Sequence, residues 1–193
     1  MQNVSVMDDD PDAAIDEKDM IRAAQADPTA FDMLYHRYAD QVYAYLRTRT
    51  STADDAADLT QQVFLQALRA LPRYQVTQVP FAAWLFRIAR NAVTNYHQRH
   101  RRTVPWVEIP EAVQPVAPCD PEAEALHRDA LARVRLLFEE LDAETRELLA
   151  LRFAAGLTAG EIAAVVGKSE AATRKKLTRT IQILKERYDD ETR

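Results

Sequence analysis

Residues 157–169 read LTAGEIAAVVGKS, a pattern that predicts a short helix, a tight turn and the start of a second helix. Thr158 and Glu161 have the spacing of a capping box, in which each side chain bonds the other residue's backbone N–H at the start of a helix. Gly167 falls where helices commonly end, because glycine readily adopts the left-handed backbone conformation needed there. Ser169 is placed to cap the helix that follows. This segment therefore predicts a helix-turn-helix.

The helix after the turn is basic, although the whole chain carries a net charge of −5. Residues 168–187 hold seven lysines and arginines against two acids, a net charge of +5, and Arg174, Lys175, Lys176 and Arg179 are among them. The second helix of a helix-turn-helix lies in the DNA major groove, where such side chains reach base edges and phosphates. These features favour duplex DNA as the ligand. A helical hairpin with a solvated basic face is the alternative.

A second basic helix is expected at residues 81–102, which contain five arginines and no acid. One face is apolar, and a second stripe consists of Arg87, Asn91, Thr94, Asn95, Gln98 and Arg101. Amides read base edges, guanidinium groups hold phosphates and nearby aromatic rings stack on unpaired bases. This face therefore suits opened nucleic acid, with an ordinary amphipathic surface helix as the alternative.

Two further helices are expected before it. Asp27 and Pro28 predict the start of one, whose buried face includes Tyr35. The next ends at Leu71, and Leu65 interrupts its polar outer stripe. An exposed leucine among polar residues indicates a docking surface for a protein, although single exposed leucines are common.

The chain divides into four segments. Residues 1–19 hold seven acids and one lysine and predict a disordered acidic arm. Residues 20–102 predict a helical domain, and residues 103–121 hold five of the nine prolines and predict an extended linker. Residues 122–193 return to helical periodicity. We therefore predict an all-α chain of two small helical domains joined by a proline-rich linker, the second a helix-turn-helix.

Composition argues against an enzyme. All three glycines lie within residues 156–167, which excludes the glycine motifs that bind dinucleotides or phosphates. The single cysteine, Cys119, excludes an intramolecular disulfide and a thiolate zinc cluster. No carboxylate or thiol completes a site with His97 and His100, so we expect neither metal nor cofactor. No apolar run reaches the ~18 residues of a membrane span, and the N-terminus lacks the order of a signal peptide. We therefore expect a cytoplasmic protein without membrane insertion.

Three motifs together resemble a known family. Residues 55–64 read DAADLTQQVF, residues 83–91 read AWLFRIARN, and the third motif spans residues 157–179. On these motifs the chain is similar to bacterial RNA polymerase sigma factors of the extracytoplasmic-function (ECF) type, over roughly residues 25–188. Such proteins contain two of the sigma domains, region two and region four, with a linker between them.

The resemblance implies a promoter-specificity subunit without catalytic residues, whose partners are core RNA polymerase, promoter DNA and an anti-sigma factor. It implies that polymerase is bound through Asp55, Asp58, Leu59, Gln61, Gln62 and Leu65. It implies that the minus-ten element is read and melted by Tyr74, Arg87, Asn91, Asn95, Gln98 and Arg99. It implies that the minus-thirty-five element is read by Ser169, Arg174, Lys175, Thr178 and Arg179.

The motifs also depart from the usual pattern of the family. Ala57 and Gln62 stand where glutamates are usual, which weakens the charge expected for docking on polymerase. Thr60 is a candidate phosphorylation site, because a phosphate would add roughly −1.5 to −2 charges to this motif. Asn95 stands where aspartate is frequent, and residues 171–173 replace a common Gly-Thr-Val, so the family's promoter preference does not transfer.

Two other functions stay open at this point. A helix-turn-helix regulator that binds duplex DNA without polymerase needs neither the tryptophan-bearing helix at residues 81–102 nor the docking helix before it. Both features therefore count against that alternative. A degenerate sigma factor that only titrates a regulator is supported by the missing acids at Ala57 and Gln62 alone.

Overall fold

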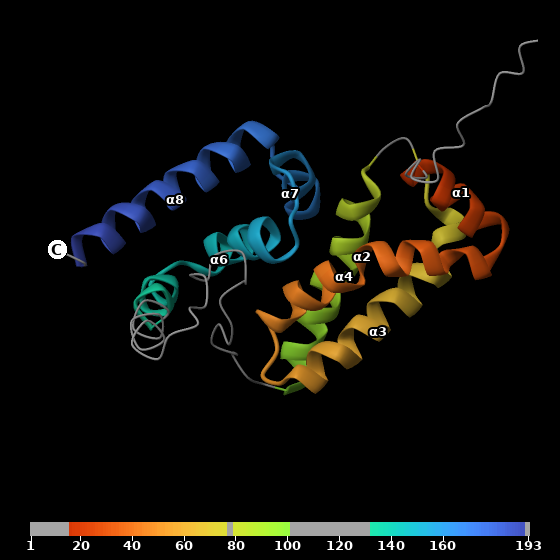
Figure 1. The fold of residues 1–193 in the computed structure, drawn as a ribbon, viewed down its shortest axis with the longest axis horizontal. Helices are drawn as coiled ribbons and strands as arrows, with labels where there is room; N and C mark the ends of the chain where they lie inside the picture. The colour runs from red at the N-terminus through yellow and green to blue at the C-terminus, as the bar shows by residue number, and fades with distance from the viewer. Residues whose placement is uncertain (1–15, 77–78, 101–131, 192–193) are drawn as a thin grey trace, which may run out of the picture.

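The computed structural model describes residues 16–76, 79–100 and 132–191, which form helices joined by short connections (Figure 1). The first domain contains α1 (Glu17–Ala26), η1 (Pro28–Ala30), α2 (Phe31–Arg47), α3 (Ala53–Ala70), η2 (Leu71–Arg73) and α4 (Phe81–His100). The second contains a helical segment at residues 132–139, α6 (Ala143–Leu149), the π-helical turn η4 (Ala150–Ala154), α7 (Ala159–Val166) and α8 (Glu170–Glu191). Within these described ranges there is no β-strand. The predicted all-α fold with two domains is confirmed.

Short polar side chains fix where the helices of the first domain begin. Asp27 accepts a hydrogen bond of 2.9 Å from the Thr29 N–H and starts the 3₁₀ turn η1, which leads into α2. Thr52 accepts a hydrogen bond of 3.0 Å from the Asp55 N–H and caps α3. Pro72 lies in the 3₁₀ turn η2, so the helical path ends in this turn and not in a free loop. Capping residues in the sequence therefore predict these starts correctly.

The helix-turn-helix has the predicted local structure. The Thr158 hydroxyl accepts from the Glu161 N–H, and the Glu161 carboxylate accepts from the Thr158 N–H at 2.8 Å, which completes the capping box. Gly167 ends α7 with a φ of 73°, in the left-handed region. The Ser169 hydroxyl accepts from the Ala172 N–H at 3.3 Å, at the start of α8.

The first domain begins earlier than predicted. α1 starts at Glu17, three residues before the boundary at residue 20, and Asp16 caps it. The Gln25 side-chain amide of α1 donates to the backbone oxygens of Leu71 at 3.0 Å and Tyr74 at 2.8 Å, so α1 holds the segment after α3 in place. The acidic composition of this stretch concealed a helix with one apolar face. The rest of the predicted arm and the linker at residues 103–121 lie outside the described residues.

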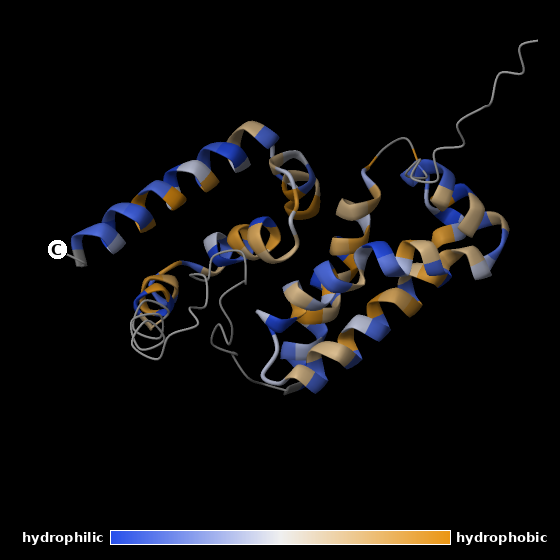
Figure 2. Cartoon of the chain, in the orientation of Figure 1, coloured by the Kyte–Doolittle hydropathy of each residue, from blue (hydrophilic) through white to orange (hydrophobic). Residues whose placement is uncertain are grey.

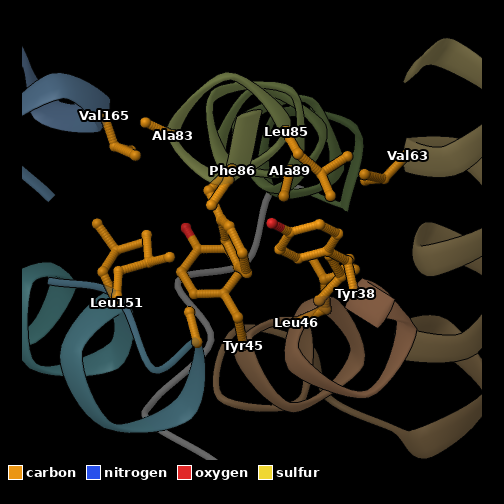
Figure 3. Packing of buried hydrophobic residues seen from close by; sticks show 14 of the residues in the cluster. Tyr38, Tyr45, Leu46, Val63, Ala83, Leu85, Phe86, Ala89, Leu151 and Val165 are labelled. Carbon is orange, nitrogen blue, oxygen red and sulfur yellow. The ribbon is translucent and has the colours of Figure 1, made fainter. Parts of the chain in front are cut away.

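One hydrophobic core includes buried residues of both domains. Tyr45 of α2 and Phe86 of α4 meet edge-to-face with ring centroids 5.6 Å apart. Leu151 and Val165 of the second domain lie on one side of these two rings (Figure 3). In keeping with this packing, α2 contacts η4 and α4 contacts α7. Hydrophilic residues dominate α8 by contrast (Figure 2). The two domains therefore share a buried interface, and α8 extends away from it (Figure 1).

Candidate functional site

The outer face of α3 presents most of the residues predicted to bind polymerase. Asp58, Gln61 and Gln62 are exposed, and the side chain of Leu65 is 52% exposed. Leu59 is only 6% exposed and belongs to the core, so in this conformation it offers little surface to a partner, and its predicted contact with polymerase stays a prediction. The helical period explains this result, because residue 59 falls on the inner face of α3.

Asp55 joins the start of α3 to α4. Its carboxylate accepts hydrogen bonds from the Thr52 hydroxyl at 2.7 Å and from the Tyr96 hydroxyl of α4 at 2.9 Å. Because these bonds use the carboxylate within the domain, Asp55 positions the outer face of α3 in addition to any contact with a partner.

An apolar groove lies beside Leu65, between α3 and the start of α2. Its volume is about 430 Å³, and its lining includes Phe31, Tyr35, Phe64 and Leu68. Tyr35 is 37% exposed, and its ring lies 4.7 Å from that of Phe64. The sequence predicts that Tyr35 is on the buried face of its helix, but this prediction is wrong: Tyr35 lies at the edge of the apolar stripe and is partly exposed. The groove and Leu65 form one apolar surface, which we call the α2–α3 groove.

The described members of the polar stripe of α4 are open to solvent as predicted: Arg87, Asn91, Thr94, Asn95 and Gln98. Arg99, also predicted for the minus-ten element, is exposed beside them, and Arg101 lies outside the described residues. Asn95 and Arg99 line a polar pocket of about 230 Å³ together with Asp58 and Gln62 of α3. The residues predicted for the minus-ten element and those predicted for polymerase therefore meet along the line between α3 and α4.

Tyr74 does not belong to this exposed stripe. Its side chain is 9% exposed, its hydroxyl donates to the Val79 backbone oxygen at 2.6 Å, and its ring lies 5.0 Å from Trp84. Tyr74 therefore fixes the connection between α3 and α4, and its predicted role in reading the minus-ten element stays a prediction. It does line a pocket of about 560 Å³ between this connection and α1, to which Lys18 and Arg22 contribute. Sequence reasoning did not single out these two cations: Lys18 was assigned to the acidic arm, and the approach of α1 to the segment after α3 was not predicted.

Arg87 touches the second domain. Its guanidinium Nε donates to the backbone oxygen of Ala164 in α7 at 2.9 Å, and Nη2 donates to the same oxygen. The residue predicted to contact the minus-ten element is thus bound here by the helix-turn-helix.

Basic side chains cover the outer face of α8. Those predicted to contact the minus-thirty-five element are exposed: Ser169, Arg174, Lys175, Thr178 and Arg179. Arg174 pairs with Glu170 one turn earlier. Lys176 turns toward α6, where its Nζ lies 3.0 Å from the Glu144 carboxylate. Lys176 therefore stabilises the second domain, and the exposed basic face consists of Arg174, Lys175 and Arg179.

Thr60 is poorly placed for modification. Its side chain is 6% exposed, and its hydroxyl donates to the Ala56 backbone oxygen at 2.7 Å within α3. A kinase would have to open α3 to reach this oxygen, so the structure does not support Thr60 as a phosphorylation site.

The described part of the chain contains no cluster of three or more His, Cys, Asp and Glu side chains arranged for a metal ion. His97 packs edge-on against Tyr96, with ring centroids 5.5 Å apart, and Cys119 lies outside the described residues. Among the helices in the described ranges, none combines the length and apolar character that crossing a membrane requires.

Comparison with known proteins gives two family matches. Sigma-70 region 2 matches residues 34–103, and Sigma-70, region 4 matches residues 131–184. Neither is an enzyme family. The ECF RNA polymerase sigma factor BldN of Streptomyces coelicolor is 34% identical over 175 residues, which are 89% of this chain and 65% of BldN. This chain therefore spans about two thirds of the length of BldN.

Two further proteins show the same relationship. The ECF RNA polymerase sigma factor SigD of Mycobacterium tuberculosis is 37% identical over 151 residues, 75% of this chain and 70% of SigD. The solved structure of CnrH in complex with the cytosolic domain of CnrY has a TM-score of 0.64 and 27% identity, and the match covers 90% of this chain and 97% of that chain. These matches confirm the resemblance noted in the three sequence motifs. The chain belongs to the ECF group of RNA polymerase sigma factors, with a region 2 domain followed by a region 4 domain.

Proposed function

We propose that this chain directs core RNA polymerase to promoters by docking through α3, opening the minus-ten element with α4 and reading the minus-thirty-five element with α8. The observation that carries the proposal is the presence of three distinct exposed surfaces on a sigma-type fold. They are the α2–α3 groove, the amide and arginine stripe of α4, and the basic face of α8. The chain acts as a subunit without catalysis of its own, in the cytoplasm with the polymerase.

The α2–α3 groove supports docking on polymerase. Leu65 and Tyr35 expose apolar surface in its lining, and Asp32 and Gln61 add exposed polar groups to the same lining. An apolar centre with a polar rim is the usual composition of a protein interface. Gln62 and Ala57 leave this interface with few charges, so apolar contact at Leu65 contributes a large share of the affinity.

The surface of α4 supports recognition of opened DNA. Three exposed amides, Asn91, Asn95 and Gln98, follow one another along the helix, with Arg99 beside them. An amide can donate to and accept from a base edge, and arginine binds phosphate. Extruding a base costs a few kcal/mol of stacking, which contacts to the extruded base offset. The pocket of about 560 Å³ beside Tyr74 has room to receive such a base.

A protein partner besides polymerase is also expected. CnrH was solved in complex with the cytosolic domain of CnrY, and this likeness supports an anti-sigma factor as a partner of this chain. The runner-up function, a regulator that binds duplex DNA without polymerase, does not account for the match to region 2.

Substitution of Leu65 tests the proposal. Leu65→Asp should weaken binding of the chain to bacterial core RNA polymerase by roughly 30-fold or more, the effect of losing a ~2 kcal/mol hot spot. Tyr43→Asp is the matched control, because Tyr43 is an exposed apolar side chain of α2 that does not line the groove. Fluorescence titration with core polymerase measures both affinities. Equal affinity of the unchanged chain and Leu65→Asp would contradict docking through this groove, and no binding by the unchanged chain would contradict the function.

A further inference from the structure

The interface between the two domains contains a polar cluster centred on Glu147 of α6. The Glu147 carboxylate accepts a hydrogen bond of 2.8 Å from the Tyr45 hydroxyl of α2. It also lies 2.7 Å from the Arg49 guanidinium and 3.7 Å from that of Arg90 on α4. Three side chains of the first domain therefore converge on one carboxylate of the second.

This cluster is largely shielded from water. The side chains of Arg49 and Glu147 are 16% and 14% exposed, and Tyr45 is fully buried. Burial raises the pKa of Tyr45 well above its usual value, so its hydroxyl stays protonated and donates to Glu147. Removing one partner of a shielded ion pair leaves an uncompensated charge, which opposes the closed interface strongly. The arrangement of the domains therefore depends on Glu147.

Apolar packing surrounds the cluster. Val165 of α7 lies beside Ala83 of α4, and Leu151 of η4 lies beside the ring of Tyr45 (Figure 3). At the edge of this packing, Arg87 donates to the Ala164 backbone oxygen of α7. The first helix of the helix-turn-helix thus rests on the helix proposed to bind the minus-ten element.

This arrangement conflicts with simultaneous reading of both promoter elements. The elements are named for positions 25 base pairs apart, which corresponds to ~85 Å along B-form DNA. Arg87 and α7, which belong to the two proposed DNA-binding domains, are in hydrogen-bond contact instead. The domains must separate before each can reach its own element.

We propose that Glu147 is a latch that holds the free chain closed, with α7 of the region 4 domain hydrogen-bonded to the Arg87 guanidinium until the domains are drawn apart. The biological meaning of the latch rests on the proposed function, since opening is what permits both elements to be bound. The latch itself is a property of the free chain and is measurable without polymerase or DNA.

Distance measurements on the full chain test the latch. Cys119 is replaced by serine, and spin labels are attached to cysteines introduced at the exposed positions Asp40 of α2 and Lys185 of α8. Double electron–electron resonance should give one short, narrow distance distribution. Glu147→Arg should shift the population toward longer and broader distances, with a rise of roughly tenfold or more in the ratio of open to closed molecules.

Glu144→Arg is the matched control. Glu144 lies on the same helix, but it pairs with Lys168 and Lys176 inside the second domain. The Glu144→Arg variant should keep the short, narrow distance distribution of the closed chain. The double variant Glu147→Arg with Arg49→Glu restores an opposite-charge pair and should return the chain toward the closed distance, which separates a lost latch from a misfolded domain.

Three results would overturn the latch: long, broad distances in the labelled chain with Glu147 intact, no change on Glu147→Arg, or equal opening by Glu144→Arg. Adding core RNA polymerase to the closed chain should lengthen the distance. If polymerase does not bind at all, that result would contradict the proposed function. The distances measured on the free chain would still test the latch by themselves.

Discussion

Asn95 of α4 lines the pocket between α3 and α4 together with Asp58 and Gln62 of α3. We expect Asn95→Ala to weaken binding of the polymerase complex to DNA with an unpaired minus-ten strand by about 1–3 kcal/mol, the discrimination carried by one good amide–base contact. It should also relax base preference at a single position. Competition binding with the four bases at each position of that strand measures both effects.

Thr94→Ala is the control for this prediction. Thr94 lies in the same polar stripe as Asn95, but its hydroxyl proton is already donated to the Arg90 backbone oxygen of its own helix at 3.0 Å, and it carries no amide to pair with a base edge. It should leave affinity and base preference unchanged. Equal losses from both substitutions would show that the helix, and not the Asn95 amide, is responsible.

Single residues also show where sequence reasoning succeeds. The exposed stripe of α4 follows from helical periodicity, because that periodicity depends on the local chain alone. The burial of Tyr74 was not predictable, because it depends on Trp84 and Val79, which approach it only in the folded domain. Tyr35 was predicted to be buried but is 37% exposed, because a residue at the edge of an apolar stripe turns inward or outward according to what packs beside it.

At the scale of elements, the turn between α7 and α8 depends on Gly167. A side chain at this position meets no atom within 4 Å, so its cost comes from the backbone alone. We expect Gly167→Ala to reduce the free energy of unfolding by about 1–2 kcal/mol, the cost of a left-handed conformation for a residue with a Cβ. Gly167→Asn should cost less, because asparagine tolerates this conformation better.

Urea unfolding followed by circular dichroism measures these differences. Gly160→Ala serves as a contrasting variant, since Gly160 lies inside α7 without a left-handed backbone and its added Cβ would meet only the flexible end of Glu170 at 3.3 Å. If Gly167→Ala were as stable as the unchanged chain, the turn would not require the observed φ.

The start of α6 predicts a dependence of stability on acid. Asp142 caps this helix by accepting from the Thr145 hydroxyl at 2.7 Å and from the Thr145 N–H at 2.8 Å. These two hydrogen bonds lower the pKa of Asp142 below its usual value. A carboxyl with a lowered pKa in the folded state adds stability that is complete above its unfolded pKa and is lost as the pH falls through its folded pKa.

The difference in unfolding free energy between the chain and Asp142→Asn should therefore shrink as the pH falls across this window. Urea titrations at several pH values measure it. Glu139→Gln, an exposed acid of the helical segment before α6, is the control and should show no such trend. A difference that stays constant with pH would contradict the capping role of the ionised carboxylate.

The elements themselves were largely predictable. Capping residues and periodic apolar positions gave the starts of α2, α7 and α8 from local information. The boundary of the first domain was placed at residue 20, inside α1, because the acids before it suggested disorder, whereas the bonds from α1 to Leu71 and Tyr74 span more than forty residues of sequence. Elements whose stability comes from distant partners are the ones that composition misjudges.

At the scale of the whole molecule, two small domains share one core and keep their basic faces on the helices proposed to meet DNA. The net charge of −5 conceals this division, because it includes seven acids within residues 1–19, away from the two basic helices in the sequence. The packing of one domain on the other was not predictable from the sequence. It depends on Glu147 meeting Arg49 across 98 residues, a contact that neither periodicity nor motif spacing specifies.

Transcription with purified core RNA polymerase tests the central claim most directly. The chain is mixed with bacterial core enzyme and genomic promoter fragments, and the transcripts are sequenced. We expect defined start sites that share an upstream motif pair, with Leu65→Asp and Asn95→Ala each reducing their yield. A chain that binds duplex DNA with sequence preference, yet neither binds core polymerase nor produces defined transcripts, would contradict it.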